Sequence, residues 1–195
     1  MKIRSVDFVK SVFDPVQLPK PGLPEIALCG RSNVGKSSLI NTLLHRRIAK
    51  TSSVPGRTRS INFVLVNHSF FFVDLPGYGY ARVPDHIQKN WQRLIESYLQ
   101  YRPSLRCVVL IVDARRDPSE DETSLVQWLE YNNIPWILVL TKIDKLPRRE
   151  HAPATARWEH VLHPRSTVCF SSLTAYGTSA LWKTFSLYLQ SQKIS

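Results

Sequence analysis

A short stretch rich in glycine and serine, GRSNVGKSS, constrains this chain more than any other feature. It runs from Gly30 to Ser38 and separates an apolar run at 26–29 from a second run, with helix-like spacing, at 39–44. Two glycines, a lysine and three serines thus stand where a strand passes into a helix. Such a junction is either a plain turn or a cradle for phosphate, and the remaining sequence has to decide between the two.

The spacing of this stretch matches the phosphate-binding loop pattern G-x-x-x-x-G-K-S. Gly30 and Gly35 allow backbone dihedrals that a Cβ would block and let amides approach phosphate oxygens. Lys36 brings a positive charge to the β- and γ-phosphates, the Ser37 hydroxyl is a hard oxygen ligand for Mg²⁺, and the helix that follows points its positive end at the anion. We therefore predict a nucleotide site that includes Gly30, Arg31, Ser32, Asn33, Val34, Gly35, Lys36, Ser37 and Ser38.

Strand-like and helix-like segments alternate along the rest of the chain. The predicted strands are 25–29, 61–66, 70–74, 107–112, 136–140 and 166–170, and a turn at 67–69 makes the second and third of them a hairpin. The predicted helices are 36–44, 87–99, 119–129, one that starts after Pro153, and 181–189. The pattern predicts a single α/β domain over 1–195, with 1–23 as an N-terminal extension. It has three layers, with helices on both faces of a mostly parallel, six-stranded sheet that contains one antiparallel strand.

The charge of the chain favours polyanionic partners. Lys and Arg number 26 against 15 Asp and Glu, a net charge of +11. Basic residues release counterions when they contact phosphates, although a merely soluble basic surface is the alternative. No apolar run approaches the ~20 residues of a membrane helix, and the three cysteines are interpreted as buried reduced thiols. These features predict a cytoplasmic protein with no membrane association.

Two further motifs lie at predicted strand ends. Asp74 can hold Mg²⁺ through a water molecule and the Gly77 amide can meet a γ-phosphate, although a strand end before a Pro-Gly turn would look similar; the motif is Asp74, Leu75, Pro76 and Gly77. Asp144 can accept from the two adjacent N–H donors of guanine, whereas adenine would leave the carboxylate unpaired. The base pocket is then predicted to comprise Thr141, Lys142, Ile143 and Asp144, closed by Phe170, Ser171 and Ser172.

The order of these motifs resembles that of the translation-factor-like GTPases. The segments LPEIALCGRSNVGKSSLIN, PGRTRSINF, VDLPGYGYA and CFSSLTAYG resemble, more narrowly, the EngB/YihA family of bacterial ribosome-biogenesis GTPases. The resemblance implies a P-loop GTPase domain that binds GTP or GDP with Mg²⁺. It also implies a role in assembly of the large ribosomal subunit, through the pre-50S particle or its ribosomal RNA and proteins, and in normal cell division and septation.

The same resemblance assigns a mobile loop around Pro55 in which Thr58 reaches Mg²⁺ when the γ-phosphate is present. The residues it adds to the predicted nucleotide site are Gly56, Arg57, Thr58, Arg59 and Ser60. The family usually has threonine just before Pro-Gly, and this chain has Val54, which leaves Thr58 as the better candidate hydroxyl.

Slow hydrolysis is expected from the residue that follows Gly77. Many GTPases place there a glutamine that orients the attacking water, and this chain has Tyr78. Asn33 has two interpretations: related GTPases with asparagine at this position can use K⁺ near the phosphates, or the side chain bonds its own loop. Lys36, Thr58 and Asn33 are thus the predicted catalytic residues.

Three classes of function remain open. The first is a monomeric GTP-driven switch in which Arg57, Arg59, Tyr78 and Tyr80 form a basic, aromatic surface for RNA when GTP orders their loops. The second is a P-loop enzyme that transfers a phosphoryl group to a small acceptor, and the third is a constitutive RNA-binding module with a vestigial nucleotide site. No segment resembles the basic lid that a small-acceptor kinase needs, and the phosphate and base positions are intact, so the switch is favoured.

Overall fold

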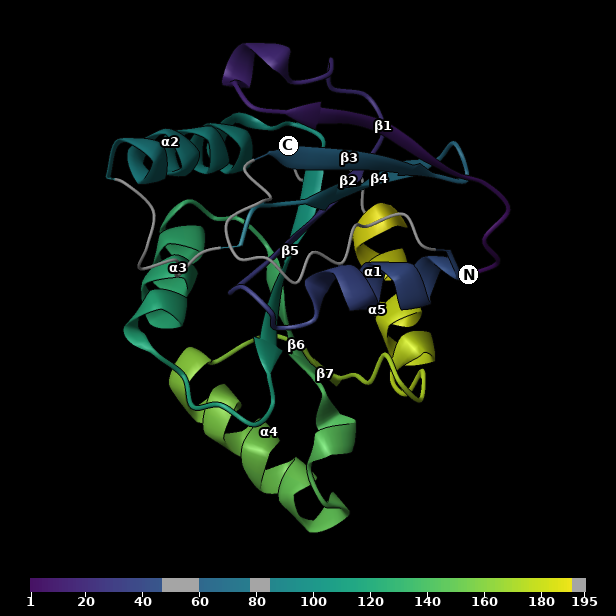
Figure 1. Cartoon of the computed structure of the whole chain (residues 1–195), viewed down its shortest axis with the longest axis vertical. Helices are drawn as coiled ribbons and strands as arrows, with labels where there is room; N and C mark the ends of the chain where they lie inside the picture. Colours follow the sequence, from purple (N-terminus) through teal and green to yellow (C-terminus); the bar gives the residue numbers. More distant parts are fainter. Residues whose placement is uncertain (47–59, 78–84, 191–195) are drawn as a thin grey trace.

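The computed structural model describes residues 1–46, 60–77 and 85–190, and in these residues the predicted three-layer α/β architecture is confirmed (Figure 1). A sheet in the order β1-β3-β4-β2-β5-β6-β7 forms the middle layer. Only β3 runs against the direction of the others, which is the predicted single antiparallel strand. The strands are β1 (Val6–Val12), β2 (Glu25–Gly30), β3 (Ile61–Val66), β4 (Phe70–Asp74), β5 (Leu105–Asp113), β6 (Trp136–Thr141) and β7 (Thr167–Cys169).

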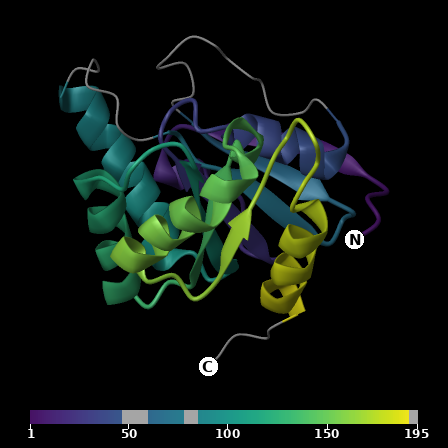
Figure 2. The same ribbon diagram turned by 90° about the horizontal axis from the view of Figure 1, so that it is seen from below.

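Helices cover both faces of this sheet, as Figures 1 and 2 show from two directions. α1 (Lys36–Leu44) and α5 (Thr178–Gln190) pack on one face, and α2 (Asp85–Tyr101), α3 (Glu120–Tyr131) and α4 (Arg148–Leu162) pack on the other. The central strands β2 and β6 are buried along their whole length, as expected for parallel strands covered on two sides. Among the described residues, none of the helices combines the length and the apolar composition needed to cross a bilayer.

The predicted count of six strands was wrong, because the N-terminal segment contributes a seventh. β1 pairs with β3 from Val6 to Val12, with a bulge between Phe8 and Lys10. The bulge shifts the alternation by one residue, so Val6 joins the core under α1 and α5 while Val12 joins the core on the opposite face. A sequence search for strict alternation misses such a strand. Part of the predicted extension 1–23 is therefore a sheet edge.

The start of α4 was also predicted wrongly. The helix begins at Arg148 and contains Pro153, although a proline within a helix removes one backbone hydrogen bond. Three buried side chains at spacings of four, Ala154, Trp158 and Leu162, hold this helix against the sheet. Their packing outweighs the missing bond. The predicted opening of α3 is confirmed, since Glu122 accepts from the backbone N–H of Ser119 at 2.9 Å in a capping box.

Two of the three cysteines are buried as expected, and the third is only half-buried. All three are free thiols: Cys29 lies in β2, Cys107 in β5 and Cys169 at the end of β7. Burial raises the pKa of the Cys29 thiol to about 12, with a smaller opposing effect from the charge of Lys36. Cys29 is therefore a packing residue and not a nucleophile at neutral pH.

Candidate functional site

The parallel strands end at one edge of the sheet, and the predicted motifs follow four of these ends. β2 leads into the loop 31–35, β4 into Leu75–Gly77, β6 into Lys142 and the turn Ile143–Lys145, and β7 into Phe170–Ser172. Because parallel strands share an orientation, their carboxyl ends lie along one edge of the sheet, which is where open α/β sheets bind ligands. The fold thus brings together segments that lie more than a hundred residues apart.

The loop between β2 and α1 depends on its two glycines. A Cβ on Gly30 would lie 2.4 Å from the Ile111 carbonyl oxygen, too close for any side chain. Gly35 has a φ of +104°, which L-residues rarely adopt. These conformations place the backbone of the loop directly before the first turn of α1, whose free N–H groups and dipole favour an anion.

The second predicted motif lies against this loop. Asp74 at the end of β4 forms an ion pair with Lys36 at the start of α1, and both side chains are nearly buried. The adjoining Gly77 passes so close that a Cβ there would lie 3.3 Å from the Ser32 amide nitrogen. If an anion and a metal ion bound here, the ion pair would separate. Lys36 would then pair with the anion and Asp74 with the metal ion.

The third motif is tied to the first by hydrogen bonds from its side chains. The Thr141 hydroxyl lies within hydrogen-bond distance of the carbonyl oxygens of Val34 and Val112. The Lys142 ammonium donates to the carbonyl oxygen of Asn33 over 2.6 Å. The segment predicted to read the base therefore sets the position of the segment predicted to hold the phosphates.

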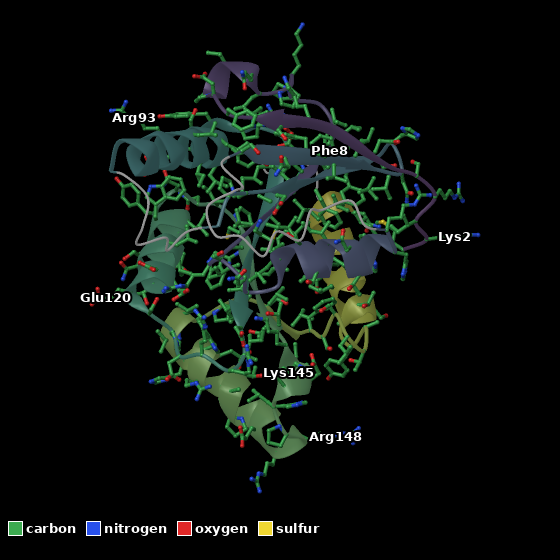
Figure 3. The ribbon with its side chains drawn as sticks, viewed as in Figure 1. Lys2, Phe8, Arg93, Glu120, Lys145 and Arg148 are labelled. Atoms are coloured by element: carbon green, nitrogen blue, oxygen red, sulfur yellow. The ribbon has the colours of Figure 1, made fainter. Side chains whose placement is uncertain are left out.

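The carboxylate of Asp144 lies in the turn that follows, where its side chain is only 14 % exposed. Among the described residues its one ion pair is with Lys145, which lies 3.9 Å from Oδ2 and is more than half exposed. Figure 3 places Lys145 and Arg148 at the same end of the molecule, where this turn passes into α4. A ligand at this end would meet one poorly paired carboxylate and several exposed cations.

The segment after β7, residues 170–172, lies beside the turn that carries Asp144. The Ile143 amide donates to the Phe170 carbonyl oxygen over 3.3 Å, which joins this segment to the turn that carries Asp144. Ser171 is buried and its hydroxyl accepts from the amides of Leu173 and Thr174, so it shapes the loop, while Ser172 is exposed.

Several predicted site residues could offer a ligand only their backbone. The side chains of Val34, Leu75, Ile143 and Phe170 are buried in the two cores. The guanidinium of Arg31 points instead to α3, where it lies 3.1 Å from Asp121. Ser60 is buried and donates to the Asn62 side chain over 3.1 Å. The predicted residues Gly56, Arg57, Thr58, Arg59, Tyr78 and Tyr80 lie outside the described residues.

One charged residue of this edge was not predicted from the sequence. Asp113 ends β5, is 3 % exposed, and lies between the guanidinium of Arg115 and the ammonium of Lys142. Burial alone would raise the pKa of this carboxyl, but hydrogen bonds from Arg115 and Lys142 outweigh it and hold the pKa well below the usual range. The sequence did contain a signal for this residue, because Asp113 directly follows the apolar run 107–112.

The comparisons with known proteins agree with this geometry. The family described as "50S ribosome-binding GTPase" matches residues 25–142. The chain is 44 % identical over 191 residues to the "Probable GTP-binding protein EngB" of Thermoanaerobacter pseudethanolicus, covering 96 % of this chain and 100 % of that protein. It is 50 % identical over 179 residues to the protein of the same name from Syntrophus aciditrophicus, covering 91 % of each chain.

Solved structures support the fold. A crystal structure of a probable GTP-binding protein EngB superposes with a TM-score of 0.71 at 21 % identity, over 86 % of this chain and 100 % of that one. Era in complex with MgGDPNP and a segment of 16S ribosomal RNA superposes with a TM-score of 0.72 at 23 % identity, over 90 % of this chain and 59 % of that one. With the extensive sequence identity of the two relatives above, these matches lead to one conclusion: the chain belongs to the EngB family of GTP-binding proteins and is a GTPase.

Proposed function

We propose that this protein is a guanine-nucleotide switch that binds the large ribosomal subunit during its assembly when GTP is bound, and that it hydrolyses GTP slowly. The observation that carries the proposal is the bond from Lys142 to the Asn33 carbonyl, with Thr141 against the Val34 carbonyl. These contacts tie the segment proposed to read the base to the loop proposed to hold the phosphates. We propose that a role in cell division and septation follows from this activity. We expect the protein to act in the cytoplasm as a monomer.

Each part of the nucleotide has proposed partners. The loop 30–38 surrounds the phosphates, Lys36 neutralises the β- and γ-phosphates, and Asp144 accepts from the guanine edge. Phe170–Ser172 closes the base pocket with its backbone. Thr58 and the Gly77 amide are the proposed sensors of the γ-phosphate, in keeping with the behaviour of GTPase switch loops.

The residues of the site fit Mg²⁺. Mg²⁺ takes a few hard oxygen ligands and keeps several waters, and the site offers the Ser37 hydroxyl in the first turn of α1 and the nearly buried carboxylate of Asp74. The hydroxyls of Ser37 and Thr58 would hold the ion directly and Asp74 through water. When bound, Mg²⁺ neutralises charge on the β- and γ-phosphates.

The residues of the chain set the rate of hydrolysis. Tyr78 stands where many GTPases have a glutamine that orients the attacking water. The water is therefore poorly oriented and intrinsic GTP hydrolysis is slow. Asn33, whose backbone φ is +62°, is the residue that would place a K⁺ ion near the phosphates, where it could offset part of this deficit. A GTPase assay in NaCl against KCl tests this, and equal rates would leave Asn33 as a loop residue only.

Two properties support a ribosomal partner. The net charge of +11 favours RNA over neutral partners, and the matching family is described by ribosome binding. The proposed contact surface consists of Arg57, Arg59, Tyr78 and Tyr80, where charges would bind phosphates and rings would stack on bases.

Co-sedimentation with purified large subunits tests the proposal. We expect more protein in the pellet with a non-hydrolysable GTP analogue than with GDP, and a steep loss with added salt. Arg57→Ala combined with Arg59→Ala should reduce that salt dependence, while Lys183→Ala on α5 should not. Equal binding with GDP and with the analogue would contradict a switch and indicate a constitutive RNA-binding protein.

A further inference from the structure

Asp113 lies next to the proposed nucleotide site without belonging to any of its motifs. It ends β5, directly across from Thr141 at the end of β6. Its Oδ2 atom lies 3.0 Å from the Lys142 ammonium, which in turn donates to the Asn33 carbonyl over 2.6 Å. A continuous chain of polar contacts therefore runs from β5 through the base-reading segment to the phosphate loop.

We propose that Asp113 is a positioning residue: its buried carboxylate holds the Lys142 ammonium against the Asn33 carbonyl, and so couples the base pocket to the phosphate loop. The inference rests on the proposed function for the position of the nucleotide. It adds a residue outside the motifs, and it states how two parts of the site are kept in register.

The need for such an anchor follows from the chemistry of lysine. A lysine side chain is a flexible four-carbon stem with a compact charge, and fixing it in one direction costs rotamer entropy. The carbonyl of Asn33 alone offers one acceptor to an ammonium with three donors. A second, charged acceptor whose own side chain is 3 % exposed strengthens the attraction and restricts the lysine stem to fewer conformations.

Arg115 competes for the same carboxylate. Its Nη2 lies 2.7 Å from Oδ2 and its Nε lies 2.9 Å from Oδ1, and its own amide also donates to Oδ1 over 3.1 Å. The side chain of Arg115 is 46 % exposed, whereas that of Lys142 is 30 % exposed. Asp113 could thus serve only to order the turn that carries Arg115, and the test has to separate the two roles.

The experiment measures the dissociation of a fluorescent GDP from the whole protein. Asp113→Asn keeps an acceptor for the Arg115 amide but removes the charge, and Lys142→Met keeps the apolar stem but removes the ammonium. Each should accelerate GDP release on the order of tenfold, the loss expected for one charge-assisted hydrogen bond. The double variant should release GDP no faster than Lys142→Met alone, because both changes break one linkage.

Arg115→Met is the matched control. It removes the competing cation and leaves Lys142 as the partner of Asp113, so GDP release should be unchanged or slower. If Asp113→Asn folds poorly, the comparison of Arg115→Met with Lys142→Met still tests the inference. The inference is overturned if Arg115→Met accelerates release as much as Lys142→Met, or if the double variant shows the product of the single effects. Rapid release from Lys142→Met with parent-like release from Asp113→Asn would refute this inference alone. No effect of Lys142→Met would also refute this inference, and it would leave the proposed base pocket standing, because that pocket depends on Asp144 and is tested by Asp144→Asn.

Discussion

At the scale of single residues, the charge of Lys36 is the one that the proposed chemistry needs most. In this structure it pairs with Asp74, and GTP with Mg²⁺ would give each of them a new partner. Lys36→Met should lower GTP hydrolysis by about 100-fold or more, the typical loss for one group that stabilises transition-state charge. Single-turnover phosphate release measures this, with Lys183→Met on the exposed face of α5 as the control. Hydrolysis at the parent rate would place the chemistry elsewhere.

The base preference also depends on one residue. Asp144→Asn replaces an acceptor with a group that can donate, so the guanine N–H donors lose their partner at a cost of about 1–3 kcal/mol per unpaired group. With two such donors we expect GTP affinity to fall by about 30-fold or more, and xanthosine triphosphate affinity to rise. Competition against fluorescent GDP measures both, and the exposed Asp7→Asn should change neither. Parent-like GTP affinity in Asp144→Asn would contradict the proposed pocket.

The sequence alone pointed to those residues of this edge that belong to a motif with fixed spacing. Gly30, Gly35 and Lys36 have the spacing of a phosphate loop, and they lie where β2 passes into α1, with Gly35 at a φ of +104°. The contact of Asp113 with Lys142 and the direction of Arg31 toward Asp121 on α3 could not be predicted. Both depend on which segments the sheet places side by side, and a pattern along the chain does not contain that information.

At the scale of elements, the N-terminal strand is an integral part of the sheet. Val12 in β1 is fully buried, whereas Val9 at the bulge is 46 % exposed. Val12→Ala should therefore lower the free energy of unfolding by about 2 kcal/mol, from the loss of two buried carbon atoms and the cavity left behind. Val9→Ala should cost almost nothing. Urea denaturation compares the two, and equal effects would mean that β1 is not packed as described.

A buried ionic network joins α2 to the start of β2. Glu25 is fully buried and accepts from the Tyr98 hydroxyl, the Ser104 hydroxyl and the Arg102 guanidinium, which also donates to the Pro19 carbonyl. Removing one partner of a buried pair leaves the other charge uncompensated.

This network gives a second stability prediction. Glu25→Gln should lower the free energy of unfolding by about 3 kcal/mol, while the exposed Glu159→Gln on α4 should change it little. Chemical denaturation at neutral pH measures both variants. If Glu25→Gln is as stable as the parent, the network does not contribute to holding α2 on the sheet.

Elements were predicted well where burial determines the pattern and poorly where it does not. β5 from Cys107 to Val112 and β6 from Trp136 to Leu140 are apolar because two helical layers cover them, so their runs of Val, Ile and Leu identify them. β1 lies at the sheet edge and contains a bulge, so its alternation is broken. In α4, packing of Trp158 and its neighbours overrides the local preference of Pro153.

At the scale of the whole molecule, the alternation of strands and helices was enough to predict the layers and the edge where the motifs meet. Crossovers between parallel strands are right-handed, and each one packs its helix against a face of the sheet. The carboxyl ends of these strands then lie at the same edge of the sheet. The net charge of +11 acts at this scale as well, because it adds to association with any RNA regardless of the bound nucleotide. Nucleotide dependence is therefore the property that distinguishes a switch from a basic protein.

The most direct test of the account exchanges the nucleotide and the base pocket together. Large-subunit co-sedimentation is measured for the parent and for Asp144→Asn, each with non-hydrolysable analogues of GTP and of xanthosine triphosphate. The account predicts that the parent binds subunits tightly only with the guanine analogue and that Asp144→Asn binds tightly only with the xanthine analogue. Subunit binding by Asp144→Asn that is the same with both analogues would contradict it, because the base pocket would then not control the partner.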